Sequence, residues 1–318
     1  MILLCLFVAC FGVAAYAKNV PVPRVSQGYL VDLATAPWHV GLYRKTASSH
    51  KQICGGTIIA KRVVITAAHC VTKDRHIVLP ASQFAVAAGK IYRLWNDIHD
   101  VDAQKSDVKE IKVPPRYQGA VTNYQHDIAL LLLTAHFNYT DHVKPACLNF
   151  DPEFDEKQLQ EGQWGKVVGW GLTGKNSRKS EVLQGATLQY ITIDKCIEQC
   201  PAGFRSLITG DKICAGYKNG TAVCRGDSGG GLVLPEVVDG IEWYFLRGVI
   251  STSPTSAGLC NIYTWSTFTH LLQHEHFVKS VLPDVEKTCG IFGGIRLPRL
   301  VDSNQRSENC KCVCTSGT

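Results

Sequence analysis

Three short segments of the sequence carry side chains whose chemistry is complementary: Thr66-Ala67-Ala68-His69-Cys70, His126-Asp127-Ile128-Ala129-Leu130 and Gly226-Asp227-Ser228-Gly229-Gly230. A serine hydroxyl is a weak nucleophile at neutral pH and needs an adjacent base, and a histidine can take up its proton near neutrality. A buried carboxylate would orient the imidazole and favour the imidazolium that forms. The backbone N–H groups of Gly226 and Ser228 would stabilise an oxyanion. We therefore predict a catalytic triad of His69, Asp127 and Ser228.

Each segment alone has an ordinary structural explanation, as a histidine beside a cysteine, an aspartate that starts a strand or a glycine-rich turn. The spacing Gly-x-Ser-x-Gly also occurs in esterases and lipases, on a strand-to-helix turn. That alternative expects alternating strands and helices, whereas this sequence contains short strand-like runs punctuated by Gly, Pro, Asn and Asp. The order His, Asp, Ser also argues against it.

In this order, the three segments resemble those of the chymotrypsin-type (trypsin-like) serine proteases, and the resemblance covers residues 25–282. Other matching segments are Pro37-Trp38, Cys54-Gly55-Gly56, Gly169-Trp170-Gly171 and Cys214-Ala215-Gly216. The resemblance implies an all-β fold of two antiparallel six-stranded β-barrels. It also implies hydrolysis of peptide bonds through an acyl-enzyme, without a cofactor or a metal.

The pattern along the chain agrees with such a fold. Strand-like runs occur at residues 40–43, 57–59, 63–65, 77–79, 128–133, 166–168 and 244–250. Near the end, apolar residues from Phe268 to Leu282 recur at nearly helical spacing, and Pro283 follows them. This predicts one C-terminal helix.

The chain of 318 residues opens with an apolar run over residues 2–15, followed by Ala15-Tyr16-Ala17. Such a run is short for a membrane span and is typical of a secretory signal. We therefore expect a signal peptide at 1–17, an activation peptide at 18–24, a protease domain at 25–282 and a Cys-containing tail at 283–318. Asn138 and Asn219 begin sequons that would carry glycans on a secreted protein.

The resemblance further implies a zymogen. Cleavage after Arg24 would create an N-terminus at Val25, whose ammonium would pair with the buried carboxylate of Asp227 and order the substrate pocket. Ser26 and Gln27 depart from the family pattern, in which an aliphatic residue and then a glycine follow the new N-terminus. The alternative is a linker that is not cleaved.

Of the 14 cysteines, Cys5 and Cys10 lie in the expected signal peptide, and the 12 that remain suit an oxidising compartment. The family pattern pairs Cys54 with Cys70, Cys196 with Cys214 and Cys224 with Cys260. The partners of Cys147, Cys200, Cys289, Cys310, Cys312 and Cys314 stay open, with Cys147–Cys289 as one candidate. For Cys310, Cys312 and Cys314, disulfides within the tail or to a partner chain are favoured over a metal site.

The primary substrate pocket of the family has as its floor the residue six positions before the nucleophile, which is Ala222 here. Because Ala222 offers no carboxylate to a basic side chain, a preference for Arg or Lys is not expected. Ser253 and Asn261 align with the pocket walls and would narrow it. This favours small or medium apolar residues before the scissile bond.

Composition and charge limit the partners. The net charge of +6 is spread along the chain, and no stretch after the N-terminal run is apolar enough to span a membrane. We expect protein or peptide substrates, an activating protease and a serpin-type inhibitor, and neither nucleic acid nor a membrane as a partner.

The segments Ala87–Lys90, Asp107–Ile111 and Leu246–Ile250 look most similar to insect haemolymph proteases of the modular type, although the sequence shows no N-terminal recognition module. Immune, digestive and venom roles therefore stay open. A non-catalytic homologue that acts as a binding or adaptor protein is the alternative to an active endopeptidase. The presence of all three triad residues favours the enzyme.

Overall fold

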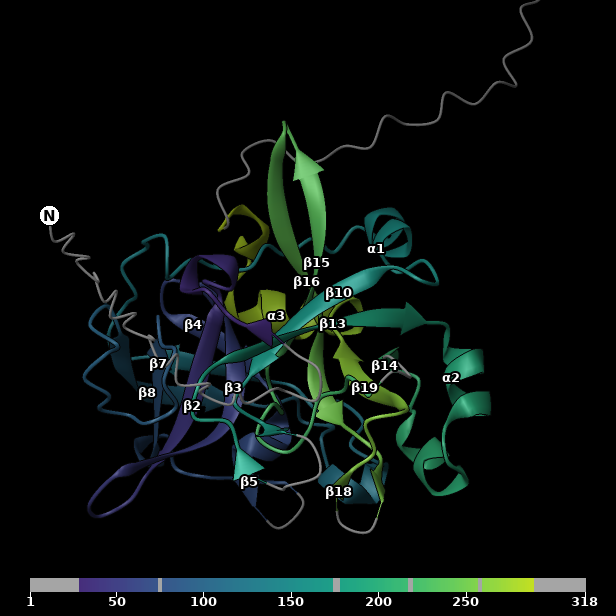
Figure 1. Cartoon of the computed structure of the whole chain (residues 1–318), viewed down its shortest axis with the longest axis horizontal. Coiled ribbons are helices and arrows are strands. Elements are labelled where there is room, and N and C mark those ends of the chain that lie inside the picture. Colours follow the sequence, from purple (N-terminus) through teal and green to yellow (C-terminus); the bar gives the residue numbers. More distant parts are fainter. Residues whose placement is uncertain (1–28, 74–75, 174–177, 217–219, 257–258, 289–318) are drawn as a thin grey trace, which may run out of the picture.

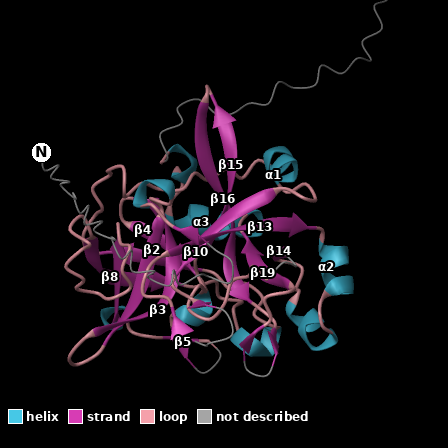
Figure 2. Ribbon diagram, viewed as in Figure 1, coloured by secondary structure: helices cyan, strands magenta, loops and turns pink. Residues whose placement is uncertain are grey.

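The computed structural model describes residues 29–73, 76–173, 178–216, 220–256 and 259–288, and strands dominate it (Figures 1 and 2). The predictions made for residues 1–17, Arg24, Val25, Asn219, Cys289, Cys310, Cys312 and Cys314 fall outside these residues. The strands form two closed antiparallel barrels, which lie side by side in Figure 1. The predicted all-β fold of two six-stranded barrels is therefore confirmed.

The first barrel closes in the order β2-β3-β4-β9-β8-β7. Its strands are β2 (His39–Lys45), β3 (His50–Ala60), β4 (Val63–Thr66), β7 (Phe84–Ala88), β8 (Gln104–Lys112) and β9 (Ala129–Leu133). All four residues of β4, Val63, Val64, Ile65 and Thr66, are buried and β-branched. Such side chains fit the pleated surface between two neighbouring strands, here β3 and β9.

The second barrel contains β10 (Trp164–Gly169), β13 (Gln184–Ile191), β14 (Lys212–Gly216), β15 (Gly231–Val238), β16 (Ile241–Thr252) and β19 (Trp265–His270). Pairing of β13 with β14 closes it, and β1 (Tyr29–Leu30) adds to the outer edge of β13. Beyond the barrel wall, β15 and β16 continue as the long hairpin that projects at the top of Figure 1. Three further two-stranded sheets are β5 (Thr72–Lys73) with β6 (Ile77–Val78), β11 (Leu172–Thr173) with β12 (Arg178–Lys179), and β17 (Thr255–Ser256) with β18 (Leu259–Cys260).

The helices of the described residues are short. They are α1 (Pro152–Gln158), α2 (Ile193–Gln199) and α3 (Glu275–Val281), together with 3-10 turns at Leu33–Thr35, Ala68–Cys70, Ala81–Gln83, Gly119–Thr122, Ala202–Leu207, Leu272–His274 and Val285–Lys287. Helix α1 begins where local chemistry predicts a start, because the side chain of Asp151 accepts a hydrogen bond from Glu153 N (2.9 Å) and Pro152 occupies the first turn.

The predicted C-terminal helix is present but begins later than expected. Residues 268–270 are the end of β19, where Phe268 pairs with Ile213 of β14 and Ile250 of β16. Two neighbouring strands thus outweigh the helical spacing of the apolar residues. Helix α3 ends at Val281, before Pro283. Packing continues past Leu282, since Val285 is buried and the hydroxyl of Thr288 donates to Ile59 O (2.7 Å).

One apolar cluster contains residues of both barrels, and the second barrel has a further cluster of its own. Buried Val64 and Leu130 of the first barrel belong to the same cluster as Val233 and Leu246 of the second. Val278 of α3 joins this cluster, so the C-terminal helix packs on residues of both barrels. This fixes the loops of one barrel relative to those of the other.

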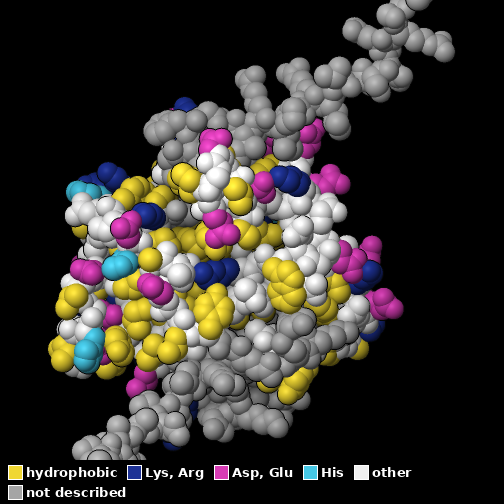
Figure 3. All heavy atoms as spheres, turned by 45° about the horizontal axis from the view of Figure 1, so that its top comes forward, with side chains coloured by type: hydrophobic (Ala, Val, Ile, Leu, Met, Phe, Trp, Pro, Cys, Tyr) yellow, Lys and Arg dark blue, Asp and Glu magenta, His cyan; other side chains and the backbone are white. Residues whose placement is uncertain are grey.

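On the face in Figure 3, basic and acidic side chains are interspersed with apolar ones. Among the described residues, no helix has the length and apolar character needed to cross a bilayer.

The structure contains the disulfides Cys54–Cys70, Cys196–Cys214 and Cys224–Cys260. Cys147 is also disulfide-bonded, whereas Cys200 is a buried free thiol.

Candidate active site

Strand pairing brings the predicted base and its carboxylate together. His69 lies in the short 3-10 turn directly after β4, and Asp127 lies two residues before β9. Because Thr66 at the end of β4 pairs with Ala129 at the start of β9, the two segments meet at one end of the first barrel. Ser228 comes from the second barrel, in the turn that precedes β15.

The contacts of His69 with Asp127 are specific. His69 Nδ1 lies 2.8 Å from Asp127 Oδ2, and the backbone N–H of His69 donates to Oδ1 at 2.9 Å. The side chain of Asp127 is fully buried, whereas that of His69 is 26% exposed. An Nδ1–H that donates to the carboxylate leaves Nε2 of the imidazole as a proton acceptor.

Two hydroxyl groups of the second barrel donate hydrogen bonds to Asp127. Ser251 Oγ donates to Oδ2 at 2.7 Å, and Thr269 Oγ1 donates to the carbonyl oxygen of Asp127 at 2.9 Å. Neither residue was predicted from the sequence. Ser251 ends an apolar run and Thr269 lies in a strand, so only the contact between the barrels reveals their role.

The electrostatic setting suits a base and a permanent anion. Burial lowers the pKa of His69, but the charge of Asp127 and its hydrogen bond outweigh burial, so the pKa is raised above its usual 6.5. Burial raises the pKa of Asp127, yet the charge and hydrogen bond of His69, the charge of Lys212 and the hydrogen bond from Ser251 together lower it to about 2. Asp127 is therefore ionised at neutral pH.

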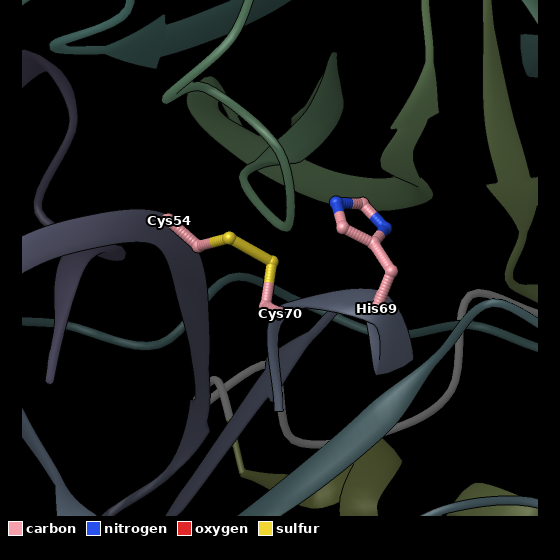
Figure 4. A group of neighbouring side chains, drawn as sticks. All are labelled: Cys54, His69 and Cys70. Atoms are coloured by element: carbon pink, nitrogen blue, oxygen red, sulfur yellow. A yellow bond between two sulfur atoms is a disulfide. The ribbon is translucent and has the colours of Figure 1, made fainter. Parts of the chain in front are cut away.

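Strand β3 contacts both the turn that contains His69 and the turn that contains Ser228. The disulfide between Cys54 of β3 and Cys70 closes the loop beside His69. Figure 4 shows His69 and Cys70 leaving the same short turn, with Cys54 on a separate strand. The next residue along β3, Gly55, donates its N–H to Ser228 O at 2.8 Å. The sulfur atoms of Cys54 and Cys70 also lie close to the His69 imidazole, but they are joined to each other and offer no thiolate to a metal.

The turn around Ser228 depends on glycine. Gly226 and Gly229 have φ values of 104° and 81°, which L side chains rarely adopt. A Cβ at Gly229 would also run into Thr66 Oγ1 and Gly55 O. The carbonyl of Gly226 accepts a hydrogen bond from Gln52 Nε2 at 3.0 Å, which orients this peptide. The glycines flanking Ser228 are therefore required by backbone geometry.

Asp227 points away from the turn into the protein. Its carboxylate accepts hydrogen bonds from the backbone N–H groups of Gly171 (2.7 Å) and Cys224 (2.9 Å). Burial raises its pKa to about 6, against these two hydrogen bonds. A Cβ at Gly169 or Gly171 would overlap the carboxylate, so the Gly-Trp-Gly segment leaves room for it.

A cavity of about 430 Å³ opens at the predicted triad. Its lining includes His69, Tyr124, Leu207, Cys224, Arg225, Ser228, Ile250, Ser251, Thr252, Ser253, Thr255 and Cys260. The described residues that line it include a cation, Arg225, but no carboxylate. Tyr124 and Arg225 were not predicted, although each lies within three residues of a triad member.

One of the three predicted pocket residues lines this cavity. Ser253 does so, and its Oγ donates to Ser266 Oγ at 2.9 Å. Ala222 instead lines a separate void of about 10 Å³ together with Asp227. The Oδ1 of Asn261 accepts the N–H of Tyr263 at 3.1 Å, which closes a local turn.

Comparison with known proteins accounts for this arrangement. A family model described as Trypsin matches residues 26–270. The chain belongs to the trypsin family of serine proteases. It is 34% identical over 262 residues to clotting factor C of Tachypleus tridentatus and 33% identical over 241 residues to the modular serine protease of Drosophila melanogaster. These matches cover 80% and 73% of this chain.

The same alignments extend over 25% of clotting factor C and 36% of the modular serine protease, so the chain spans about a quarter to a third of these relatives. Serine protease ea of Drosophila melanogaster is 32% identical over 262 residues, which cover 77% of this chain and 65% of that protein. Membership of the trypsin family agrees with the barrels, the disulfides and the arrangement of His69, Asp127 and Ser228.

Proposed function

We propose that the chain is a secreted serine endopeptidase with His69, Asp127 and Ser228 as its catalytic triad. The observation that carries this proposal is the hydrogen-bonded pair of His69 and Asp127, which opens onto the same cavity as Ser228. Ser228 Oγ attacks the scissile carbonyl while His69 Nε2 takes its proton. His69 then protonates the leaving amine. Water, activated by the same base, releases the acyl group from Ser228.

The buried charge of Asp127 supports this sequence of proton transfers, because it stabilises the imidazolium without becoming protonated itself. In the same proposal, the N–H groups of Gly226 and Ser228 donate to the carbonyl oxygen as it becomes negative. Loss of one such donor typically lowers kcat by about 100- to 1000-fold.

Labelling with a fluorophosphonate probe tests the proposal against the alternative of a non-catalytic binding or adaptor protein. The activated chain should label at Ser228, and the variants Ser228→Ala and His69→Ala should not. Protein that is folded and cleaved after Arg24 but does not label would support the adaptor role instead.

We also propose activation by cleavage after Arg24. The support is Asp227, a carboxylate that is 5% exposed and whose pKa burial raises to about 6. An ammonium at Val25 would compensate this charge, and the gain would order the turn of Ser228. N-terminal sequencing of active protein should find Val25 first. Active protein with any other N-terminus would contradict the scheme.

The proposed specificity is for small or medium apolar residues before the scissile bond. Among the described residues, the cavity presents Arg225 and uncharged side chains, so an Arg or Lys of the substrate would find no partner charge there. Ser253 narrows the same cavity. Cleavage-site profiling with a peptide library tests this, and dominant cleavage after Arg or Lys would refute it.

The proposed partners are protein substrates outside the cell, an activating protease and a serpin-type inhibitor. Relatives named clotting factor C and proclotting enzyme support a place in a proteolytic cascade. Asn138 is exposed, as a glycan acceptor must be, and we propose it as a glycosylation site together with Asn219, which lies outside the described residues.

A further inference from the structure

Behind the catalytic aspartate, two imidazoles and a carboxylate converge from three separate segments. His126 precedes Asp127, Asp211 precedes β14, and His274 lies at the end of the turn before α3. One ligand atom from each residue lies within 4.8 Å of the other two. His126 Nδ1 is 3.3 Å from His274 Nε2, which in turn is 3.6 Å from Asp211 Oδ2.

We propose that His126, Asp211 and His274 form a site for a zinc-class transition-metal ion, with Nδ1, Oδ2 and Nε2 as its ligands. Two imidazoles with one carboxylate are a ligand set that Zn²⁺ commonly takes, and water fills the fourth position. Such a site goes beyond the proposed protease activity, which needs no metal.

Outer contacts already orient the two buried ligands. His274 Nδ1 faces the carbonyl oxygen of His270 at 2.9 Å, so a proton on Nδ1 donates there and the lone pair of Nε2 faces His126. Thr209 Oγ1 donates to Asp211 Oδ1 at 2.6 Å, which leaves Oδ2 on the side of the imidazoles. A histidine that donates its second nitrogen to a backbone carbonyl is typical of metal ligands.

Burial and access also suit a metal. His274 is 4% and Asp211 5% exposed, whereas His126 is partly exposed and gives the site a route from solvent.

The charges around the site select among cations. Lys212 Nζ lies 3.4 Å from Asp211 Oδ2 and also donates to Tyr124 O (2.7 Å) and Thr269 Oγ1 (3.0 Å). The backbone N–H of His126 donates to the same Oδ2 at 2.8 Å. Because Lys212 already balances much of the carboxylate charge, the imidazoles must supply most of the affinity. This favours zinc, copper or nickel over calcium or magnesium.

An occupied site would restrain the segment that leads into the triad. The φ values of Asn123, Tyr124 and His126 are 53°, 58° and 59°. Positive φ values of this size cost energy for residues other than glycine. Tyr124 lines the active-site cavity. A metal held by His126 would therefore fix both a wall of that cavity and the residue next to Asp127.

Calorimetric titration with ZnCl₂ tests the proposal, using the full secreted chain with Ser228→Ala, after removal of metal by EDTA and dialysis. The variants are His126→Asn, in which asparagine tolerates the positive φ, and His274→Gln. His276→Gln is the matched control, because His276 is exposed two residues beyond His274. We expect one Zn²⁺ per parent chain and per control chain. Binding should weaken by about 100-fold or more in each ligand variant, since changes to outer contacts alone cost about 10- to 100-fold.

Thermal unfolding provides a second readout that does not require activity. At Zn²⁺ about 100-fold above its Kd, the midpoint of the parent should rise by roughly 5–10 °C. His126→Asn should lose this rise, and because its side chain is on a partly exposed loop, it tests the site even if His274→Gln fails to fold. Unchanged Zn²⁺ affinity in His126→Asn would overturn the proposal. A parent chain that binds Zn²⁺ with a Kd above about 100 µM would also overturn it, since the contact between the imidazoles would then be a hydrogen bond only.

Discussion

Loss of the hydrogen bond from Ser251 to Asp127 should lower the stability of the protein more than its catalytic activity. It is 2.7 Å long and buried, and it reaches the same Oδ2 that faces His69. A hydrogen bond to a charged group contributes about 1.5–3 kcal/mol. Ser251→Ala should therefore lower the free energy of unfolding at neutral pH by about 2 kcal/mol. The pKa of Asp127 should rise in this variant, because one of the interactions that lower it is lost.

The effect on catalysis should be smaller. Asp127 is ionised both before and during the reaction, so the bond from Ser251 is made in the ground state and in the transition state alike. We expect kcat/KM of Ser251→Ala to fall by less than about tenfold, which is about 1.4 kcal/mol.

Urea unfolding in a Ser228→Ala background, which prevents self-digestion, measures the stability, and a peptide substrate measures kcat/KM. Ser106→Ala is the matched control, because Ser106 is also buried but bonds only to neutral groups, among them Ala135 N at 3.0 Å. Its loss should be about 1 kcal/mol. Equal stability losses in the two variants, or a loss of kcat/KM above about 1000-fold with normal stability, would refute the reasoning.

Three further predictions concern charge. The acidic limb of the profile of kcat/KM against pH should have its midpoint above 6.5. The reason is that the proposed mechanism requires neutral His69, whose pKa is raised. A midpoint below 6.5 would contradict this. Asp155→Ala should lower the free energy of unfolding in urea by about 3–5 kcal/mol. It removes the carboxylate that lies 2.8 Å from the guanidinium of Arg247, whose side chain is only 1% exposed. A decrease below about 1 kcal/mol would contradict this. Before cleavage, the free energy of unfolding should fall by about 3 kcal/mol as pH rises from about 4 to 6. The carboxylate of Asp227 has a pKa near 3.8 in the unfolded chain and of about 6 in the folded chain. Asp227→Asn should therefore abolish this pH dependence when the free energy of unfolding is measured as a function of pH.

The barrels were predictable because their strands have local signatures. Runs such as residues 63–65 and 128–133 combine branched apolar side chains with flanking turn residues, and they lie in or overlap β4 and β9. The C-terminal segment shows where this fails. The apolar spacing from Phe268 is nearly helical, but residues 268–270 are paired on both sides by strands distant in sequence. Periodicity does not report such neighbours.

The lining of the cavity at the predicted triad was less predictable than the strands for the same reason. Ser253 reaches it, whereas Ala222 lies in a separate void and Asn261 closes its own turn. Residues 252–261 form loops and a short hairpin, where small changes in length redirect side chains without leaving a mark in composition or spacing.

The sequence by itself predicted the chemistry: the three segments of the proposed triad, the glycines that the serine turn requires and, through the resemblance to the family, three cysteine pairs. The need for glycine is a local feature, because backbone sterics impose it. Only the tertiary structure decided what surrounds that chemistry. Ser251 and Thr269 reach Asp127 from the other barrel, and His126, Asp211 and His274 meet behind it. Such groups are separated by up to 148 residues and come together because residues of the two barrels pack in one apolar cluster.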